Sequence, residues 1–317
     1  MTSGAAETGA HVATDTPTGG RLPDFIVVGA MKAGTTTLYA YLAQHPQIYM
    51  CQRKEPGFFS RNENYAKGMD WYRQLYTEAA PDQLCGEAST CYTRQLEFPS
   101  TAARIAKHIP DAKLIYLVRH PVERAYSHYV HLMAQRWTTE CRAPLPLSSA
   151  LQEYPTIVDT SKYSSQLERY LTYFSRKNLM VIVLDDLAAN PEASVAAAHS
   201  FLGLREFWDP TGGHLHMNPS GLMVAHRAAT KRFGGYKKRL WGALLRRLLP
   251  RRARAWLRSL ALERLRRTAT AANEVAAFRD SLEDMPPAVR ERLLGEFEES
   301  TAWVEHFTGR QLPAWRK

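Results

Sequence analysis

The 317-residue chain lacks several features that would restrict its function. No apolar run approaches the ~18 residues of a membrane-spanning helix, and residues 1–20 contain no Lys, no Arg and no apolar block. We therefore expect neither a transmembrane span nor a secretory signal peptide. Residues 1–23 are rich in Ala, Thr, Gly and Ser, and we expect them to form a disordered leader.

Cysteine is also scarce. The four cysteines form no C-x-x-C pair, and no His cluster of zinc spacing lies near them; they are Cys51, Cys85, Cys91 and Cys141. This usage predicts reduced thiols in a cytoplasmic protein, without a disulfide framework and without a metal site.

What the chain does have is ordinary globular composition, with 45% hydrophobic, 23% charged and 10% aromatic residues. Short apolar runs at 25–29, 112–118 and 179–184 predict buried parallel strands. Each run is followed by a helical pattern, which predicts an α/β fold with a parallel sheet flanked by helices. The expected helices are 38–42, 121–134, 191–202 and, near the end of the chain, 287–308.

A glycine-bearing turn, residues 29–37, follows the first predicted strand and opens a helix. Such a turn directs backbone N–H groups inward and predicts an anion site. The ATP-binding version has a Lys after its second Gly, but Thr35 occupies that position here, and the turn's lysine is Lys32. A phosphotransferase with a variant phosphate loop is therefore the alternative, and a ligand bound without Mg²⁺ fits better.

Four further segments follow in a fixed order. They read K-E-P-G-F-F at 54–59, G-M-D-W-Y at 68–72, G-E-A-S-T-C-Y at 86–92 and L-V-R-H-P-V-E-R-A-Y-S-H-Y at 117–129. With the glycine turn, they resemble the heparan-sulfate-type branch of the sulfotransferases that use 3′-phosphoadenosine 5′-phosphosulfate (PAPS). The resemblance covers residues 24–230 and 284–315.

The resemblance implies a P-loop-like parallel sheet in a single domain with a helical C-terminal extension. It divides the chain into a sulfotransferase core at 24–230, a basic helical insertion at 231–284 and a closing helix at 285–317. It also implies PAPS as co-substrate, bound without a metal, and a hydroxyl-bearing small molecule, glycoside or lipid as acceptor. Ala88 stands where some members carry a Lys, which argues against a highly sulfated polysaccharide held by that cation.

The resemblance also implies the residues that bind the donor. Lys32 would lie beside the oxygen that bridges sulfate and 5′-phosphate, and Arg119 and Ser127 would clamp the 3′-phosphate. Backbone and hydroxyl groups at the 5′ end would come from Ala33, Gly34, Thr35, Thr36 and Thr37, and further contacts from Ser220 and Gly221. An Arg delivered at the carboxyl end of a buried strand is well placed for bidentate phosphate contact.

Two carboxylates compete for the role of general base. Glu55 occupies the base position of the resembled branch, and the apolar residues after it would partly desolvate it. Glu87 is the rival. Three histidines, at 120, 128 and 131, lie in the predicted 3′-phosphate motif, and we expect them at the wrong end of the donor for this role.

Positive charge is concentrated in one segment. Residues 231–267 contain 14 Lys and Arg and one Glu, a net charge of +13, which leaves −3 for the rest of a chain of net charge +10. Within it, 240–260 has Leu and Trp at helical spacing beside Arg, which fits either docking on an anionic membrane surface or packing of the Leu face on the enzyme. The acidic remainder disfavours nucleic acid as a partner, and the sequence leaves the oligomeric state open.

Overall fold

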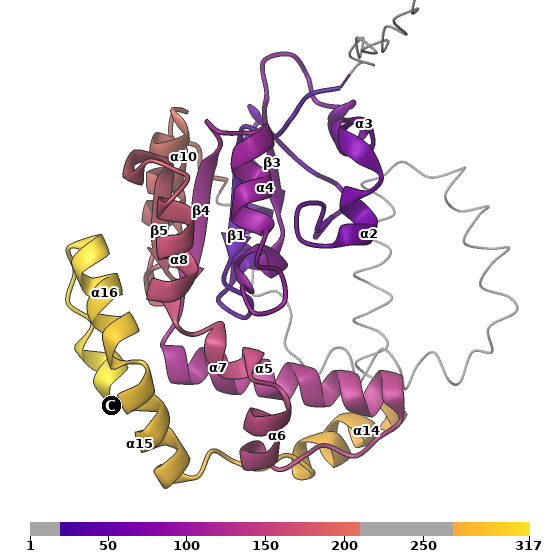
Figure 1. Cartoon of the computed structure of the whole chain (residues 1–317), viewed down its shortest axis with the longest axis vertical. Helices are drawn as coiled ribbons and strands as arrows, with labels where there is room; N and C mark the ends of the chain where they lie inside the picture. The colour runs from indigo at the N-terminus through magenta and orange to yellow at the C-terminus, as the bar shows by residue number, and fades with distance from the viewer. Residues whose placement is uncertain (1–19, 210–268) are drawn as a thin grey trace, which may run out of the picture.

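The computed structural model describes residues 20–209 and 269–317. Its centre is a sheet of five parallel strands in the order β2-β3-β1-β4-β5 (Figure 1). The strands are β1 (Phe25–Gly29), β2 (Ile48–Met50), β3 (Leu84–Ala88), β4 (Lys113–Val118) and β5 (Leu179–Val183). β1 and β4 are almost wholly buried because helices cover both faces, which explains their continuous apolar sequences.

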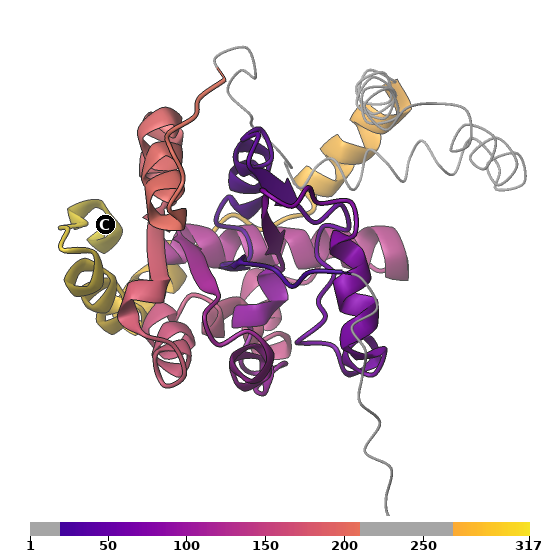
Figure 2. The same ribbon diagram turned by 90° about the horizontal axis from the view of Figure 1, so that it is seen from above.

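Helices form a layer on each face of the sheet, as the view from above shows (Figure 2). α1 (Thr35–Leu42) and α10 (Pro191–Leu202) pack together on one face, and α4 (Thr101–His108) and α8 (Tyr163–Leu171) cover the other. Asn190 caps α10 by accepting a hydrogen bond from Ala193 N at 3.1 Å, and Pro191 occupies its first turn.

The carboxyl edge of the sheet is crossed by a long helix, α5 (Pro121–Gln135), at the bottom of Figure 1. A π-helical turn, Arg136–Glu140, continues it, and α15 (Pro287–Glu296) packs against it. The other short helices are α2 (Asn62–Tyr65), α3 (Gly68–Arg73), α6 (Leu147–Glu153), α7 (Thr156–Asp159), α9 (Leu184–Ala189), α14 (Ala269–Asp280) and α16 (Glu298–Thr308), with 3-10 turns at Gln74–Tyr76, Thr90–Thr93, Arg176–Asn178 and Pro313–Arg316.

The predicted fold class is confirmed, as are the three predicted strands, with shifts of at most one residue at their ends. The continuous helix expected over 287–308 is wrong. The helix breaks at Phe297, whose side chain is buried in the same apolar cluster as Leu293. The break redirects the chain so that α16 packs on α8.

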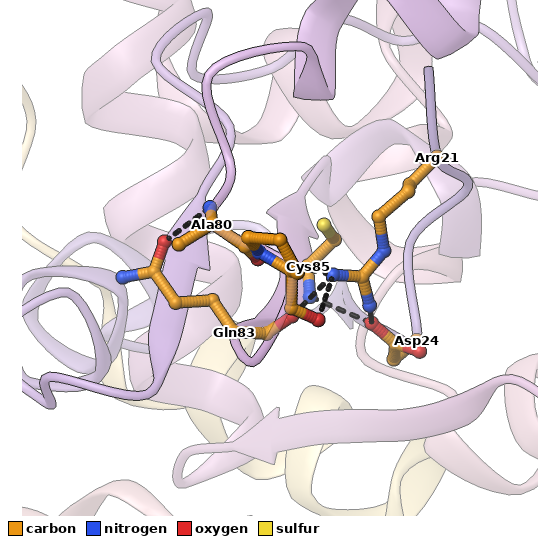
Figure 3. A network of polar contacts seen from close by, with 6 residues as sticks. Arg21, Asp24, Ala80, Gln83 and Cys85 are labelled. Atoms are coloured by element: carbon orange, nitrogen blue, oxygen red, sulfur yellow. Dashed lines mark hydrogen bonds and ion pairs between the residues drawn. The ribbon is translucent and has the colours of Figure 1, made fainter. Parts of the chain in front are cut away.

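A polar network fixes the amino end of β3 beside β1 (Figure 3). Arg21 Nη1 donates to the carbonyl oxygens of Ala80 and Gln83 at 3.2 and 2.8 Å, and Asp24 Oδ2 accepts a hydrogen bond from Cys85 N at 2.7 Å. Asp24 N in turn donates to Cys85 O at 2.7 Å. These bonds set the register of β3, which carries Glu87.

Several predictions fall outside the described residues. They are the leader up to residue 19, most of the basic insertion including 240–260, and the donor contacts at Ser220 and Gly221. Among the residues that the structure does describe, no helix has the length and hydropathy needed to cross a bilayer.

Candidate active site

The glycine turn joins β1 to α1 at the carboxyl edge of the sheet. Gly29 is required by close packing, because a Cβ there would lie 2.1 Å from Thr93 Oγ1 and 2.8 Å from a Tyr116 ring carbon. Gly34 adopts a φ of 92°, which glycine accommodates without strain. Within the described chain, the N–H groups of Gly34, Thr35 and Thr36 donate to no other protein group, and the first turn of α1 carries no acidic residue. The turn therefore presents free donors at the positive end of a helix.

Cations surround this turn. Burial lowers the pKa of Lys32, and the nearby charges of Arg119 and Arg124 lower that pKa further. Arg119 follows the last residue of β4, as predicted, and its contact with Glu123 is long, at 3.9 Å. The structure therefore brings Lys32 and Arg119, residues from two neighbouring strands, into one electropositive site suited to a phosphorylated ligand.

The remaining predicted donor residues lie on two helices that meet this site. Ala33 and Thr35 are buried at the start of α1, and Thr36 and Thr37 are half-buried in its first turn. Ser127 is half-buried on α5, two turns from Arg119. Residues predicted to bind PAPS, from the glycine turn and from α5, thus lie at the same edge of the sheet.

Glu55 lies on the loop that follows β2, and its carboxylate remains 41% exposed. Thr90 Oγ1 donates to Glu55 Oε2 at 3.0 Å, and Lys54 Nζ donates to Oε1 at 3.2 Å. Two hydrogen bonds attach this loop to the end of β3 and the residue after it: Glu55 N donates to Ala88 O at 3.2 Å, and Gly57 N donates to Ser89 Oγ at 3.1 Å. A carboxylate so held is fixed in direction and still open to a second molecule.

Lys32 and Glu55 share an uncommon backbone conformation. Their φ angles are 70° and 61°, and in the described chain only Cys141 among other non-glycine residues has a positive φ. Such a conformation costs on the order of 1 kcal/mol for a residue with a Cβ, and it is concentrated at functional sites. Two of the three strained positions are therefore the two residues predicted from sequence to act in catalysis.

Glu87, the rival base, is fully buried on β3. The phenol groups of three tyrosines, Tyr72, Tyr76 and Tyr92, surround its carboxyl and lower its pKa, yet none completes a hydrogen bond of ordinary geometry with it. Burial outweighs the phenols and raises the pKa of Glu87 to about 7. Glu87 thus differs from Glu55, whose side chain is partly exposed.

We expect Glu87→Gln to change how stability depends on pH. Because the folded-state pKa of about 7 lies above the ordinary 4.5, the native state keeps a proton that the unfolded state loses between these pH values. Stability from this group is fully present below pH 4.5 and falls as pH rises to about 7, by about 3 kcal/mol. The glutamine cannot ionise, so the variant should gain about that amount on wild type between pH 4 and pH 8.

Urea denaturation of both proteins across this range measures the difference. Two histidines with a pKa of about 4, the half-buried His131 and the buried His199, also titrate in the window, but they are common to both proteins and their contributions cancel. A stability difference that does not vary with pH would contradict this account of Glu87.

One of the three histidines of the predicted 3′-phosphate motif is influenced by both predicted catalytic residues. His131 lies on α5, one turn beyond Ser127, and its pKa is lowered to about 4 by burial and then by Lys32 and Arg94, while Glu55 opposes that shift. His131 therefore lies within electrostatic range of both Lys32 and Glu55. His128 is fully buried, and its pKa is well below the ordinary value.

In residues 20–209 and 269–317, no group of three or more His, Cys, Asp or Glu side chains is arranged to hold a metal ion. The thiols of Cys51, Cys85 and Cys91 are free and buried, whereas Cys141 is exposed.

Comparison with known proteins gives consistent matches. The family model described as "Sulfotransferase domain" matches residues 22–213. Human bifunctional heparan sulfate N-deacetylase/N-sulfotransferase 2 is 31% identical over 210 residues, 60% of this chain and 23% of that protein. Human heparan sulfate glucosamine 3-O-sulfotransferase 6 is 30% identical over 243 residues, 76% of this chain and 68% of the relative. The chain thus spans about a quarter of the first relative and two thirds of the second.

A solved structure shares the fold. A sulfotransferase from Alicyclobacillus acidocaldarius aligns with a TM-score of 0.61 and 24% identity, covering 94% of this chain and 100% of that one.

Proposed function

Because the chain belongs to the sulfotransferase family, we propose that it moves the sulfuryl group of PAPS to a hydroxyl of a small-molecule, glycoside or lipid acceptor. One observation carries the proposal: Lys32 and Arg119 share an electropositive site at the free N–H groups of α1. PAPS carries a phosphate at the 3′ position and a phosphosulfate at the 5′ position of its adenosine. Helix N-termini and arginine side chains are suited to binding such groups.

In the proposed reaction the acceptor oxygen attacks sulfur while the bond between sulfur and the 5′-phosphate oxygen breaks. Glu55 takes the hydroxyl proton, and the exposed carboxylate held by Thr90 supports that role. Lys32 stabilises the charge that grows on the departing phosphate, and its lowered pKa supports a second role as proton donor to that oxygen. Arg119 and Ser127 hold the 3′-phosphate, and Ala33 to Thr37 the 5′ end.

The burial of Glu87 supports Glu55 as base. The proposal also places the neutral imidazole of His131 beside the acceptor, because Lys32 and Glu55 both act on its pKa. The heparan sulfate named for the relatives is one acceptor class to include in assays, although Ala88 lacks the cation that would favour it.

Calorimetry with adenosine 3′,5′-bisphosphate, the product of the donor, tests the proposal. We expect binding that persists in EDTA, and transfer of labelled sulfate from PAPS to a hydroxyl acceptor. ATP with Mg²⁺ is the matched comparison, because a phosphotransferase would bind it and need the metal. Absence of binding by the bisphosphate would overturn the proposal.

A further inference from the structure

Arg124 is the largest fully buried side chain of the described chain, and it was not among the residues predicted from the sequence. It lies in the first turn of α5. Its Nε donates to Ser161 Oγ at 2.6 Å, its Nη1 to Met31 O at 3.4 Å, and its Nη2 to the carbonyl oxygen of Ile157. Arg124 therefore joins the glycine turn, one residue before Lys32, to α7 and to Ser161, which lies between α7 and α8.

Ser161 and its neighbour Tyr163 also form hydrogen bonds with the turn that carries Arg119. Ser161 Oγ donates to Pro121 O at 2.8 Å, and Tyr163 Oη donates to Arg119 O at 2.6 Å. Arg119 N donates back to Tyr163 Oη at 3.3 Å. Two loops that carry cations are thus tied to one buried set of side chains, with Arg124 at its centre.

The charge of Arg124 is not balanced at contact. Its oxygen partners are all uncharged, its Nη1 also lies 3.3 Å from His128 Nδ1, and no carboxylate of the described residues lies within ion-pair distance. The nearby carboxylate of Asp159 acts on the guanidinium only from beyond that distance. Burial lowers the pKa of Arg124 to about 10, which still leaves it protonated at neutral pH. A buried charge without a counter-ion is costly, so its retention needs an explanation.

Another arginine on the same structural unit shows the ordinary solution. Arg136 directly follows α5 and is also buried, but its Nη1 lies 3.5 Å from Glu153 Oε1 and its Nε donates to Ala143 O at 2.8 Å. Arg136 is therefore paired within the protein, whereas Arg124 faces Lys32 and Arg119, two further cations.

We propose that Arg124 is a positioning residue of the nucleotide site, which fixes the loops of Lys32 and Arg119 relative to each other and whose charge is balanced by the bound phosphates. This inference rests on the proposed function. It explains why the guanidinium is surrounded by carbonyl and hydroxyl oxygens, which fix its position without cancelling its field. The phosphates then supply anions nearer to the three cations than the carboxylate of Asp159.

Calorimetry with adenosine 3′,5′-bisphosphate, repeated at several ionic strengths, tests the inference together with steady-state kinetics. We expect Arg124→Met to raise the Kd at least about 10-fold at low salt, to weaken its salt dependence and to lower kcat about 10²-fold. Arg124→Lys should restore the salt dependence, because it keeps the charge. It should leave kcat low, because an ammonium lacks the planar fork that reaches three partners.

Two further variants separate positioning from general stability. Arg136→Met should lower the melting temperature and leave the Kd within twofold of wild type. Ser161→Ala keeps both arginines and should lower kcat more than it raises the Kd, so it decides the matter if Arg124→Met does not fold. A wild-type Kd and salt dependence in Arg124→Met, or a wild-type kcat in Ser161→Ala, would overturn the inference. Failure of the wild-type protein itself to bind the bisphosphate would instead overturn the proposed function.

Discussion

Lys32→Ala is expected to lower kcat at least about 10³-fold while the protein remains folded. The ammonium is the one group of the glycine turn that can neutralise charge developing on a leaving phosphate, and removing a single such donor typically costs a factor of 10² to 10³. Burial, and then the charges of Arg119 and Arg124, lower the pKa of Lys32, so its proton is more readily donated than that of a surface lysine. Loss of both charge and proton should therefore exceed the effect of losing a hydrogen bond.

The measurement is single-turnover transfer of labelled sulfate under saturating PAPS, so that weaker donor binding does not contribute. Lys107→Ala is the matched control, because Lys107 is an exposed lysine on α4, away from the carboxyl edge of the sheet. Turnover within tenfold of wild type in Lys32→Ala would show that another group bears the charge of the leaving phosphate.

Glu55→Gln is expected to lower kcat by about 10² to 10⁴, the usual range for loss of a general base. The amide oxygen can still accept the hydrogen bond of Thr90, so the loop should keep its place while the proton acceptor is lost. Binding of adenosine 3′,5′-bisphosphate should stay within twofold of wild type, since Glu55 does not belong to the phosphate-binding set. This split between turnover and nucleotide affinity is what distinguishes a base from a donor-binding residue.

Glu63→Gln, on the short helix after the loop, is the control for a neighbouring carboxylate. If Glu55→Gln keeps its activity and Glu87→Gln loses it, the role of base passes to Glu87, and the buried carboxyl must then become accessible during the reaction.

The sheet could be predicted from sequence where burial is continuous and not elsewhere. β1, β4 and β5 are apolar runs, so their burial is visible in composition. β3 was missed because it reads L-C-G-E-A, with Gly86 and Glu87 in the middle. The Phe25 ring fills the space beside Gly86, where a Cβ would lie 2.2 Å from it, and only tertiary structure reveals that exchange. β2, with three residues, is too short for any periodicity.

The parts of the site that depend on residue type and local spacing could be predicted from the sequence. The parts that depend on contacts between residues distant in the sequence could not. The turn around Lys32 and the strand end at Arg119 follow from local sequence. Arg124 looks like an ordinary helix arginine until its distant partners, Ser161 and Met31, are known. The burial that distinguishes Glu87 from Glu55 is equally a property of packing, since neither carboxylate lies in a sequence pattern that shows how deeply it is buried.

The helix that crosses the carboxyl edge also acts as a spacer. Arg124, Ser127 and His131 lie on α5 within seven residues, a rise of about 10 Å. A residue proposed to bind the 3′-phosphate and a residue proposed to lie beside the acceptor are therefore held at a fixed spacing by one rigid helix. One inserted residue would rotate everything beyond it by about 100°. A change of acceptor is thus more readily achieved by substitutions or insertions in the surrounding loops than by insertions in α5.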